Sequence, residues 1–183
     1  SFNYELERIL FVDLGVSYNK TDQDVRGMNA AGFAFDTLAT WQGTWLPRLA
    51  VSANLSPTFH IYHSISYGNA NPTVFEMIDY ENNTYNLRLK PERGTSMETG
   101  IKHQITSIGL KYELSYYTFN LDDAILAYAV SNGSDTRNYY HNAGQTNQQG
   151  LEWSADWEYR KGNPLFSLKL SSTGSFYFYH YKY

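Results

Sequence analysis

The sequence contains no cysteine, which excludes disulfide frameworks, thiolate zinc sites and cysteine nucleophiles. It has no run of 18 apolar residues, so no transmembrane helix is expected along the chain. Basic residues are few and mixed with acidic ones, since 14 Lys and Arg against 18 Asp and Glu give a formal net charge of −4. No basic stripe is present that could neutralise a phosphate backbone, and a nucleic-acid partner is therefore not expected.

Aromatic residues are abundant, with 17 Tyr, 10 Phe and 4 Trp among the 183 residues. Side chains of this kind favour β-strands. The chain has the length of one domain and is too short for two of typical size, so a single architecture should account for all of it. These features favour an all-β protein.

Apolar and polar residues alternate along seven stretches of the chain, which is the pattern of strands with one apolar and one polar face. In the clearest example, Leu151, Trp153 and Trp157 alternate with Glu152 and Asp156. Every Lys, Arg, Asp and Glu within the alternating stretches falls on the polar face. The alternation therefore predicts at least six strands, each with one apolar side.

Short and long connections join these stretches in strict alternation. Ser56-Pro57, Thr106-Ser107 and residues 161–164 read as tight turns, whereas roughly 25 residues join the other neighbours. Outer-membrane barrels are built this way, with short periplasmic turns and long extracellular loops. The pattern predicts an antiparallel up-and-down meander whose strands point alternately outward and inward. The expected strands, outward first, lie near residues 9–18, 46–55, 58–68, 95–104, 108–122, 148–160 and 165–180, and the long loops near 20–45, 69–94 and 123–147.

A soluble β-sandwich is the main alternative, because its strands also alternate apolar and polar residues. Loops of roughly 25 residues at one end only are less natural there, since most hairpin loops have about two to five residues. Aromatic residues end several apolar faces and fit the aromatic girdle of a membrane barrel; they are Tyr18, Tyr67, Tyr116 and Tyr159. A sandwich core could use the same residues, so both architectures stay open on alternation alone.

Six short motifs follow one another in order between about residues 46 and 160. They are Pro47-Arg48-Leu49; Tyr62-His63-Ser64-Ile65-Ser66-Tyr67-Gly68; Leu89-Lys90-Pro91-Glu92 leading into Glu98-Thr99-Gly100-Ile101-Lys102; Tyr116-Tyr117-Thr118-Phe119 with Asp122-Asp123-Ala124-Ile125; Tyr140-His141-Asn142-Ala143-Gly144; and Gln149-Gly150-Leu151-Glu152. In this order they resemble the barrel of a TonB-dependent receptor of the ferric-siderophore type. The alternation of short and long connections agrees independently with the topology of that family.

The resemblance implies an all-β, antiparallel up-and-down meander that is part of a 22-stranded transmembrane β-barrel in the bacterial outer membrane. Residues 1–183 would form a partial barrel domain of about seven strands, without the plug domain, the first half of the barrel and the closing strands. The implied function is TonB-dependent import of a scarce nutrient, with a ferric siderophore as the expected substrate. TonB would act through the plug, and outer-membrane lipid would surround the wall.

Neither enzyme activity nor a cofactor is expected, because no set of residues in the sequence forms a recognisable catalytic or metal site. His60 and His63 are three positions apart, which places them on opposite faces of a strand, and His63 interrupts an otherwise apolar face. Two other functions stay open: a soluble β-sandwich module that binds carbohydrate, and an outer-membrane pore that works without TonB.

Ligand contacts are expected in the long loops. The resemblance places the ligand where the extracellular loops meet the plug, and Arg and aromatic side chains suit an anionic iron chelate through charge and stacking. The candidate ligand-binding residues are Trp41, Tyr80, Arg137 and Tyr140. Residues of these types are equally common as packing residues within loops, so both roles are open for each of them.

Overall fold

The protein folds into one large sheet and three small hairpins in the computed structural model, which describes residues 1–28, 34–80, 84–133, 135–160 and 167–182. The large sheet contains β1 (Phe2–Leu6), β2 (Leu10–Asn19), β5 (Thr44–Ser56), β6 (Phe59–Ala70), β9 (Glu92–Ile105), β10 (Leu110–Asp122), β13 (Gln145–Arg160) and β14 (Ser167–Lys182). The hairpins are β3 (Asp22–Met28) with β4 (Ala34–Thr40), β7 (Ile78–Asp79) with β8 (Thr84–Tyr85), and β11 (Ile125–Asn132) with β12 (Asp135–Asn142).

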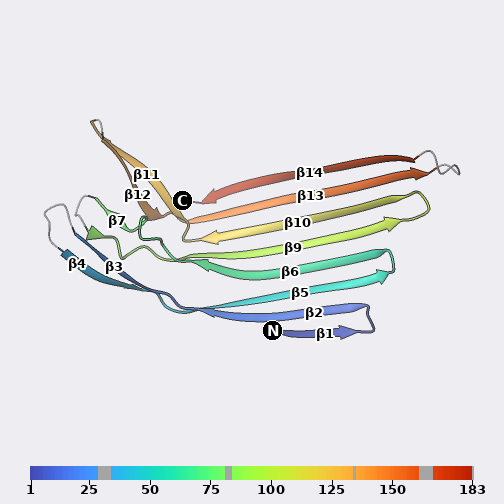
Figure 1. Cartoon of the computed structure of the whole chain (residues 1–183), viewed down its shortest axis with the longest axis horizontal. Coiled ribbons are helices and arrows are strands. Elements are labelled where there is room, and N and C mark those ends of the chain that lie inside the picture. Colours follow the sequence, from blue (N-terminus) through green and yellow to red (C-terminus); the bar gives the residue numbers. More distant parts are fainter. Residues whose placement is uncertain (29–33, 81–83, 134, 161–166, 183) are drawn as a thin grey trace.

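The eight strands of the large sheet are antiparallel and follow one another in chain order, apart from the hairpins inserted between them. The short turns lie at one end of the sheet, here named the turn end, and the three hairpins lie at the other, the hairpin end (Figure 1). This confirms the predicted meander with short and long connections in alternation. The turn expected at residues 161–164 lies outside the described residues.

The structure contains elements that alternation did not reveal. β1 is an eighth strand of the sheet, and its residues Phe2, Tyr4 and Leu6 lie opposite apolar residues of β2. With five residues it is too short to show a clear period in the sequence. Each long connection also contains a hairpin, whose strands pair with one another outside the large sheet.

The strand register gives the large sheet one continuous apolar face. Residues that lie opposite one another on neighbouring strands form rows across the sheet, and apolar rows alternate with polar rows. One row crosses all eight strands without a polar side chain and consists of Leu6, Leu10, Ala53, Ile61, Ile101, Leu114, Trp153 and Gly174. The predicted faces of the strands are therefore confirmed.

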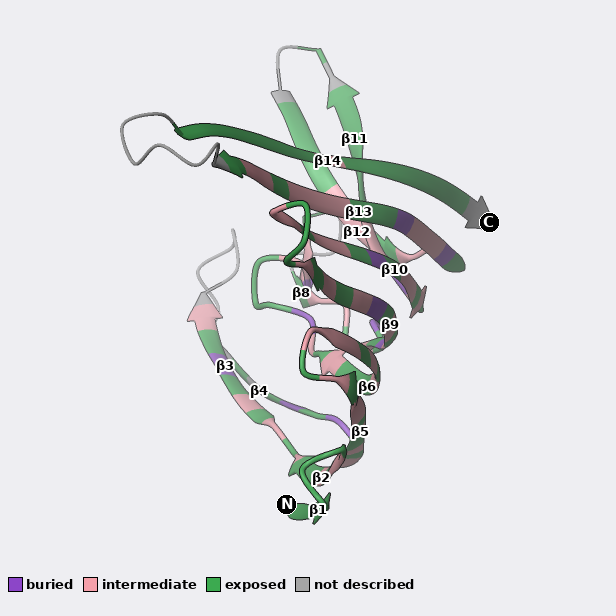
Figure 2. Cartoon of the chain, turned by 90° about the vertical axis from the view of Figure 1, so that its right-hand side faces the viewer, coloured by how far each residue is buried: buried purple, intermediate pink, exposed green. Residues whose placement is uncertain are grey.

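No second layer of described residues covers this apolar face. Val16 is 61% exposed, Trp45 66% and Phe176 61%. Figure 2 shows the sheet as a single curved wall whose residues are mostly exposed or half-buried. A soluble sandwich would have to bury such a surface, because soluble monomers rarely expose contiguous apolar patches of more than a few hundred Å². The structure therefore contradicts the β-sandwich alternative. Among the described residues, no helix is long and apolar enough to cross a membrane.

His63 interrupts the apolar face, as the sequence indicated, and the structure gives it a local partner. It lies directly opposite Thr99 on β9, and its Nδ1 is 2.7 Å from the Thr99 hydroxyl. This hydrogen bond satisfies the ring on a surface that offers few polar groups. His60 lies on the other face of β6, opposite Lys102, so the two histidines do not approach one another.

The polar face carries charged pairs that match across neighbouring strands. Lys102 Nζ lies 2.8 Å from a Glu113 carboxylate oxygen, and the Tyr62 hydroxyl donates to Glu98 over 2.8 Å.

Two glycines lie beneath tyrosine rings on this face. An added Cβ at Gly100 would come within 2.4 Å of the Tyr62 ring, and one at Gly150 would come equally close to the ring of Tyr117. At these two positions, glycine leaves the space in which the ring lies across the neighbouring strand.

The described strands do not close into a ring, since β1 and β14 are not paired with one another. β14 is 16 residues long and pairs with β13 along one edge only. In lipid, each unpaired backbone group costs several kcal/mol, so an open edge of this length requires further strands. The described strands therefore form an open sheet with β1 and β14 at its two edges.

A charge should be far more costly on the apolar face than on the polar one. In lipid vesicles, Leu114→Arg is expected to lower the stability of the protein by about 2–4 kcal/mol, because its side chain lies on the apolar face near the middle of the sheet. Ser154→Arg is the matched control, since Ser154 lies opposite Glu113 on the polar face. Urea unfolding in vesicles measures both variants, and equal losses would contradict the assignment of the faces.

Candidate functional site

The three hairpin connections share one small apolar core at the hairpin end of the sheet. It contains Val25, Ala39, Trp41, Met77 and Leu89, all buried, with Tyr85 and Tyr140 packed against it. Residues from all three long connections therefore meet in it. The Trp41 indole N–H also donates to the carbonyl oxygen of Leu89 over 3.3 Å, which ties the first connection to the second.

Asn142 joins the second and third connections through hydrogen bonds to the backbone. Its side-chain oxygen accepts from the Lys90 N–H at 2.8 Å, and its amide group donates to the Lys90 carbonyl at 2.9 Å and the Asp123 carbonyl at 2.7 Å. The Lys90 ammonium lies 3.6 Å from the Asp123 carboxylate. Asn142 thereby connects the starts of β9 and β13 with the end of β10.

A second set of hydrogen bonds lies beside Asn142. The Ile125 N–H donates to the Glu92 carboxylate over 2.7 Å, and the Ala143 N–H donates to the Ala124 carbonyl over 2.7 Å. Three of the sequence motifs thus meet at one place: the one containing Lys90 and Glu92, the one containing Ile125, and the one containing Asn142. Their residues hold the outer ends of β9, β10 and β13 together.

Beyond this junction, the second and third hairpins touch through an aromatic cluster. The Arg137 guanidinium lies over the Tyr80 ring, 5.2 Å from its centre, and the Tyr80 and Tyr139 rings meet edge to face with centres 5.9 Å apart. Tyr139 in turn stacks on Tyr128 at 5.7 Å, and His141 meets Tyr128 edge to face at 5.3 Å. Five side chains from two hairpins, here named the Tyr80–Arg137 cluster, therefore form one surface with a cation and several ring faces.

The first hairpin carries a different set of charges. Arg26 lies between two carboxylates, 2.6 Å from Asp24 and 3.3 Å from Asp36. The side-chain hydrogen bond between Asp36 and Asp24, with partial desolvation and the charge of Asp24, raises the pKa of the Asp36 carboxyl. The Arg26 guanidinium is thus paired with two carboxylates of its own hairpin.

The four residues predicted to bind ligand fall into two pairs. Tyr80 and Arg137 come together in the cluster, although they lie on different hairpins. Trp41 and Tyr140 belong to the apolar core beneath, and Trp41 is only 9% exposed. Strand alternation explains the division on β12, where Arg137, Tyr139 and His141 lie on one face and Tyr140 on the other.

Sequence reasoning missed Tyr128 and His141 as members of the cluster. The spacing of Arg137, Tyr139 and His141 at every second position was a usable signal, because it places three such side chains on one face of a strand. Tyr128 could not be found in this way, since its place depends on lying opposite Tyr139 in the hairpin. Trp45, the last residue of the long loop expected near residues 20–45, instead lies on the apolar face of the sheet beside Tyr18, with ring centres 4.9 Å apart.

No metal centre accompanies this surface in the part of the chain that the structure describes. There, no three His, Cys, Asp or Glu side chains gather closely enough to hold an ion. The cluster therefore offers charge, ring faces and hydrogen bonds to a ligand.

Known proteins share this architecture. The sequence matches the family model described as TonB dependent receptor-like, beta-barrel, over residues 2–183. The chain is similar in structure to a double mutant of the Serratia marcescens hemophore receptor HasR, with 18% identity, a TM-score of 0.64 and coverage of 95% of this chain and 32% of that one. No curated protein sequence matches.

Two further structures show the same fold. The copper transporter OprC has 15% identity and a TM-score of 0.67, with coverage of 96% of this chain and 28% of that one. The siderophore receptor PirA from Pseudomonas aeruginosa has 19% identity and a TM-score of 0.63, with coverage of 96% and 30%. The chain thus spans about a third or less of each of these structures.

Replacing Asn142 should loosen the junction between the second and third connections. Asn142→Ala removes three hydrogen bonds, each with a net value of about 1 kcal/mol, so the exchange of the Lys90 and Ala143 amide protons should accelerate about ten-fold or more. Asn138→Ala, on the exposed part of the same strand, is the matched control and should leave both amides protected. Unchanged protection in Asn142→Ala would show that other contacts hold the hairpins.

Proposed function

Because the chain belongs to the family of TonB-dependent receptor-like β-barrels, we propose that it is part of a receptor that imports a scarce nutrient across the bacterial outer membrane with energy delivered by TonB. The barrels of this family lie in the outer membrane, which accounts for a sheet with one bare apolar face. The observation that supports the proposal best is the combination of that lipid-facing wall with three connected hairpins at its outer end. TonB acts on a plug domain inside the barrel in this proposal, and the activity is transport, not catalysis.

The proposed substrate is a ferric siderophore or a chelate of similar chemistry. An anionic chelate with aromatic groups matches the Tyr80–Arg137 cluster, where a guanidinium and several ring faces lie side by side. The fold does not select the substrate, since the similar structures include a siderophore receptor, a hemophore receptor and a copper transporter. The choice rests on the side chains of the cluster.

Within this proposal the four candidate residues have two roles. Tyr80 and Arg137 contact the ligand directly, because both are exposed at the surface of the hairpins. Trp41 and Tyr140 support that surface from the core beneath it. The hydrogen bonds of Asn142 to the backbone then keep the two halves of the cluster in register.

Uptake by whole cells tests the function. Cells that lack the receptor should take up a labelled ferric siderophore at least ten-fold more slowly than complemented cells, with the effective chelate identified from a panel. A protonophore should abolish the difference, because TonB draws on the proton gradient of the inner membrane. Uptake that persists with the protonophore would instead indicate a passive pore.

Substitutions in the complete receptor test the site. Arg137→Gln and Tyr80→Ala are each expected to weaken binding of the active chelate about five- to ten-fold, which corresponds to about 1–1.4 kcal/mol for a lost cation or ring contact. Arg26→Gln is the matched control, because Arg26 is an exposed hairpin arginine held by Asp24 and Asp36. Unchanged affinity in both test variants would remove the cluster from the binding site while leaving transport itself untouched.

A further inference from the structure

One polar pair lies in the middle of the apolar face. On β6 the residues of this face are Phe59, Ile61, His63, Ile65 and Tyr67, so the imidazole has two apolar side chains of its own strand on either side. An ionisable side chain at such a depth is costly in lipid, and residues of this kind usually have a partner and a function. The role of the imidazole therefore depends on what its ring nitrogens bind.

The hydrogen bond between His63 and Thr99 leaves each side chain with one unused hydrogen-bonding group. If Nδ1–H donates to the hydroxyl, the Nε2 lone pair and the hydroxyl hydrogen stay unused; if the hydroxyl donates, the Nε2–H and a hydroxyl lone pair stay unused. Neither side chain has another hydrogen-bond partner among the described residues. With either tautomer, the pair thus offers one donor and one acceptor to a group outside the sheet.

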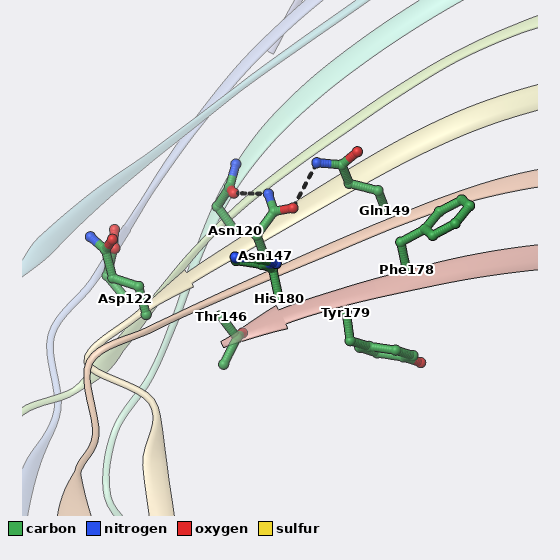
Figure 3. A pocket seen from close by; sticks show the side chains of 9 residues that line it. Asn120, Asp122, Thr146, Asn147, Gln149, Phe178, Tyr179 and His180 are labelled. Carbon is green, nitrogen blue, oxygen red and sulfur yellow. Dashed lines mark hydrogen bonds between the residues drawn. The ribbon is translucent and has the colours of Figure 1, made fainter. Parts of the chain in front are cut away.

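Other polar side chains on this face bond one another near the ends of the strands. At the hairpin end, Asn147 donates to Asn120 and accepts from Gln149 (Figure 3). The His63–Thr99 pair differs from these amides in its depth, since apolar residues follow it in both directions along β6 and β9. Acyl chains have neither a donor nor an acceptor, so lipid cannot bind the unused groups of the pair.

The surface around the pair is formed by aliphatic side chains. Its neighbours on the apolar face of β5, β6 and β9 are Val51, Ile61, Ile65, Met97 and Ile101. Aromatic rings begin on the next strand, β10, with Tyr116 opposite Thr99. Proteins associate within lipid through close packing and hydrogen bonds between chains, and this patch offers both.

A second copy of the chain would match the donor and the acceptor of the pair. Copies in one membrane share their orientation, so a two-fold axis along the membrane normal brings equal depths of the two walls together. In such a contact residue i of one copy meets residue j of the other, and j meets i. We propose that two copies of the receptor associate in the outer membrane through β5, β6 and β9. His63 Nε2 of each copy then shares a hydrogen bond with the Thr99 hydroxyl of the other.

His63→Leu in the complete receptor separates association from folding. Leucine suits an apolar face, so stability in vesicles should not fall, as measured by urea unfolding. The affinity between copies should fall about ten-fold, because a symmetric contact loses two hydrogen bonds. Energy transfer between copies labelled with donor and acceptor dyes measures the dimer fraction in phosphatidylcholine vesicles at several protein-to-lipid ratios.

His103→Leu is the matched control, since it makes the same exchange on the same face of β9. Its Nδ1 lies 3.2 Å from the Tyr112 hydroxyl, four residues from Thr99 towards the turn end, and the dimer affinity should stay the same. Thr99→Val removes the other half of the contact at nearly constant size and should weaken the dimer as much as His63→Leu. Full affinity in both test variants would overturn the proposal, and so would an equal loss in the control.

Cysteine crosslinking locates the contact on the wall. The chain has no cysteine, so a single introduced cysteine in an otherwise cysteine-free receptor reports one position. Under mild oxidation in vesicles, Ile61→Cys beside the pair should give disulfide-linked dimers, whereas Leu170→Cys on β14 should not. Equal linking at the two positions, or linking at Leu170→Cys alone, would overturn the proposal. These measurements need no transported ligand, so they are independent of the proposed substrate.

Discussion

The rest of the structure depends on the requirement that backbone polar groups be paired inside a hydrocarbon layer. An unpaired peptide group there costs several kcal/mol, so a chain that crosses with strands must pair every strand on both sides. The meander meets this requirement for its six inner strands, each of which pairs with the strands before and after it in the sheet, whereas β1 and β14 pair on one side only. The alternating faces then follow from the pleat, which sends successive side chains to lipid and to the lumen.

The hairpin end follows a different constraint, since side chains rather than lipid must hold it together. Three connections with no common strand pairing are joined by one apolar core and by the contacts of Asn142 with the backbone. Because side chains alternate along β12, Tyr140 points into the core and Arg137 points to the surface. The exposed cluster and the apolar core beneath it thus take adjacent residues of one strand.

The sheet could be predicted well from sequence, because its strands are long and each faces two different media. Seven strands, their faces and their order followed from alternation and turn spacing, whereas β1 with its five residues was too short to show a period. The candidate site was harder to predict from the sequence. Tyr80 and Arg137 were found as residue types suited to a chelate, but their meeting depends on two hairpins that pair only within themselves. Asn142 appeared as part of a motif, and only the structure showed its three hydrogen bonds to the backbone.

The tyrosine rings that lie over glycines also determine the shape of the polar face of the sheet. Tyr62 lies opposite Gly100, and Tyr117 lies opposite Gly150, so each ring rests across the neighbouring strand in space that a Cβ there would occupy. A large aromatic side chain therefore projects little from the polar face. The rings lie flat on the polar face instead of standing away from it, so the relief of that face at these two levels is set by residues that have no side chain.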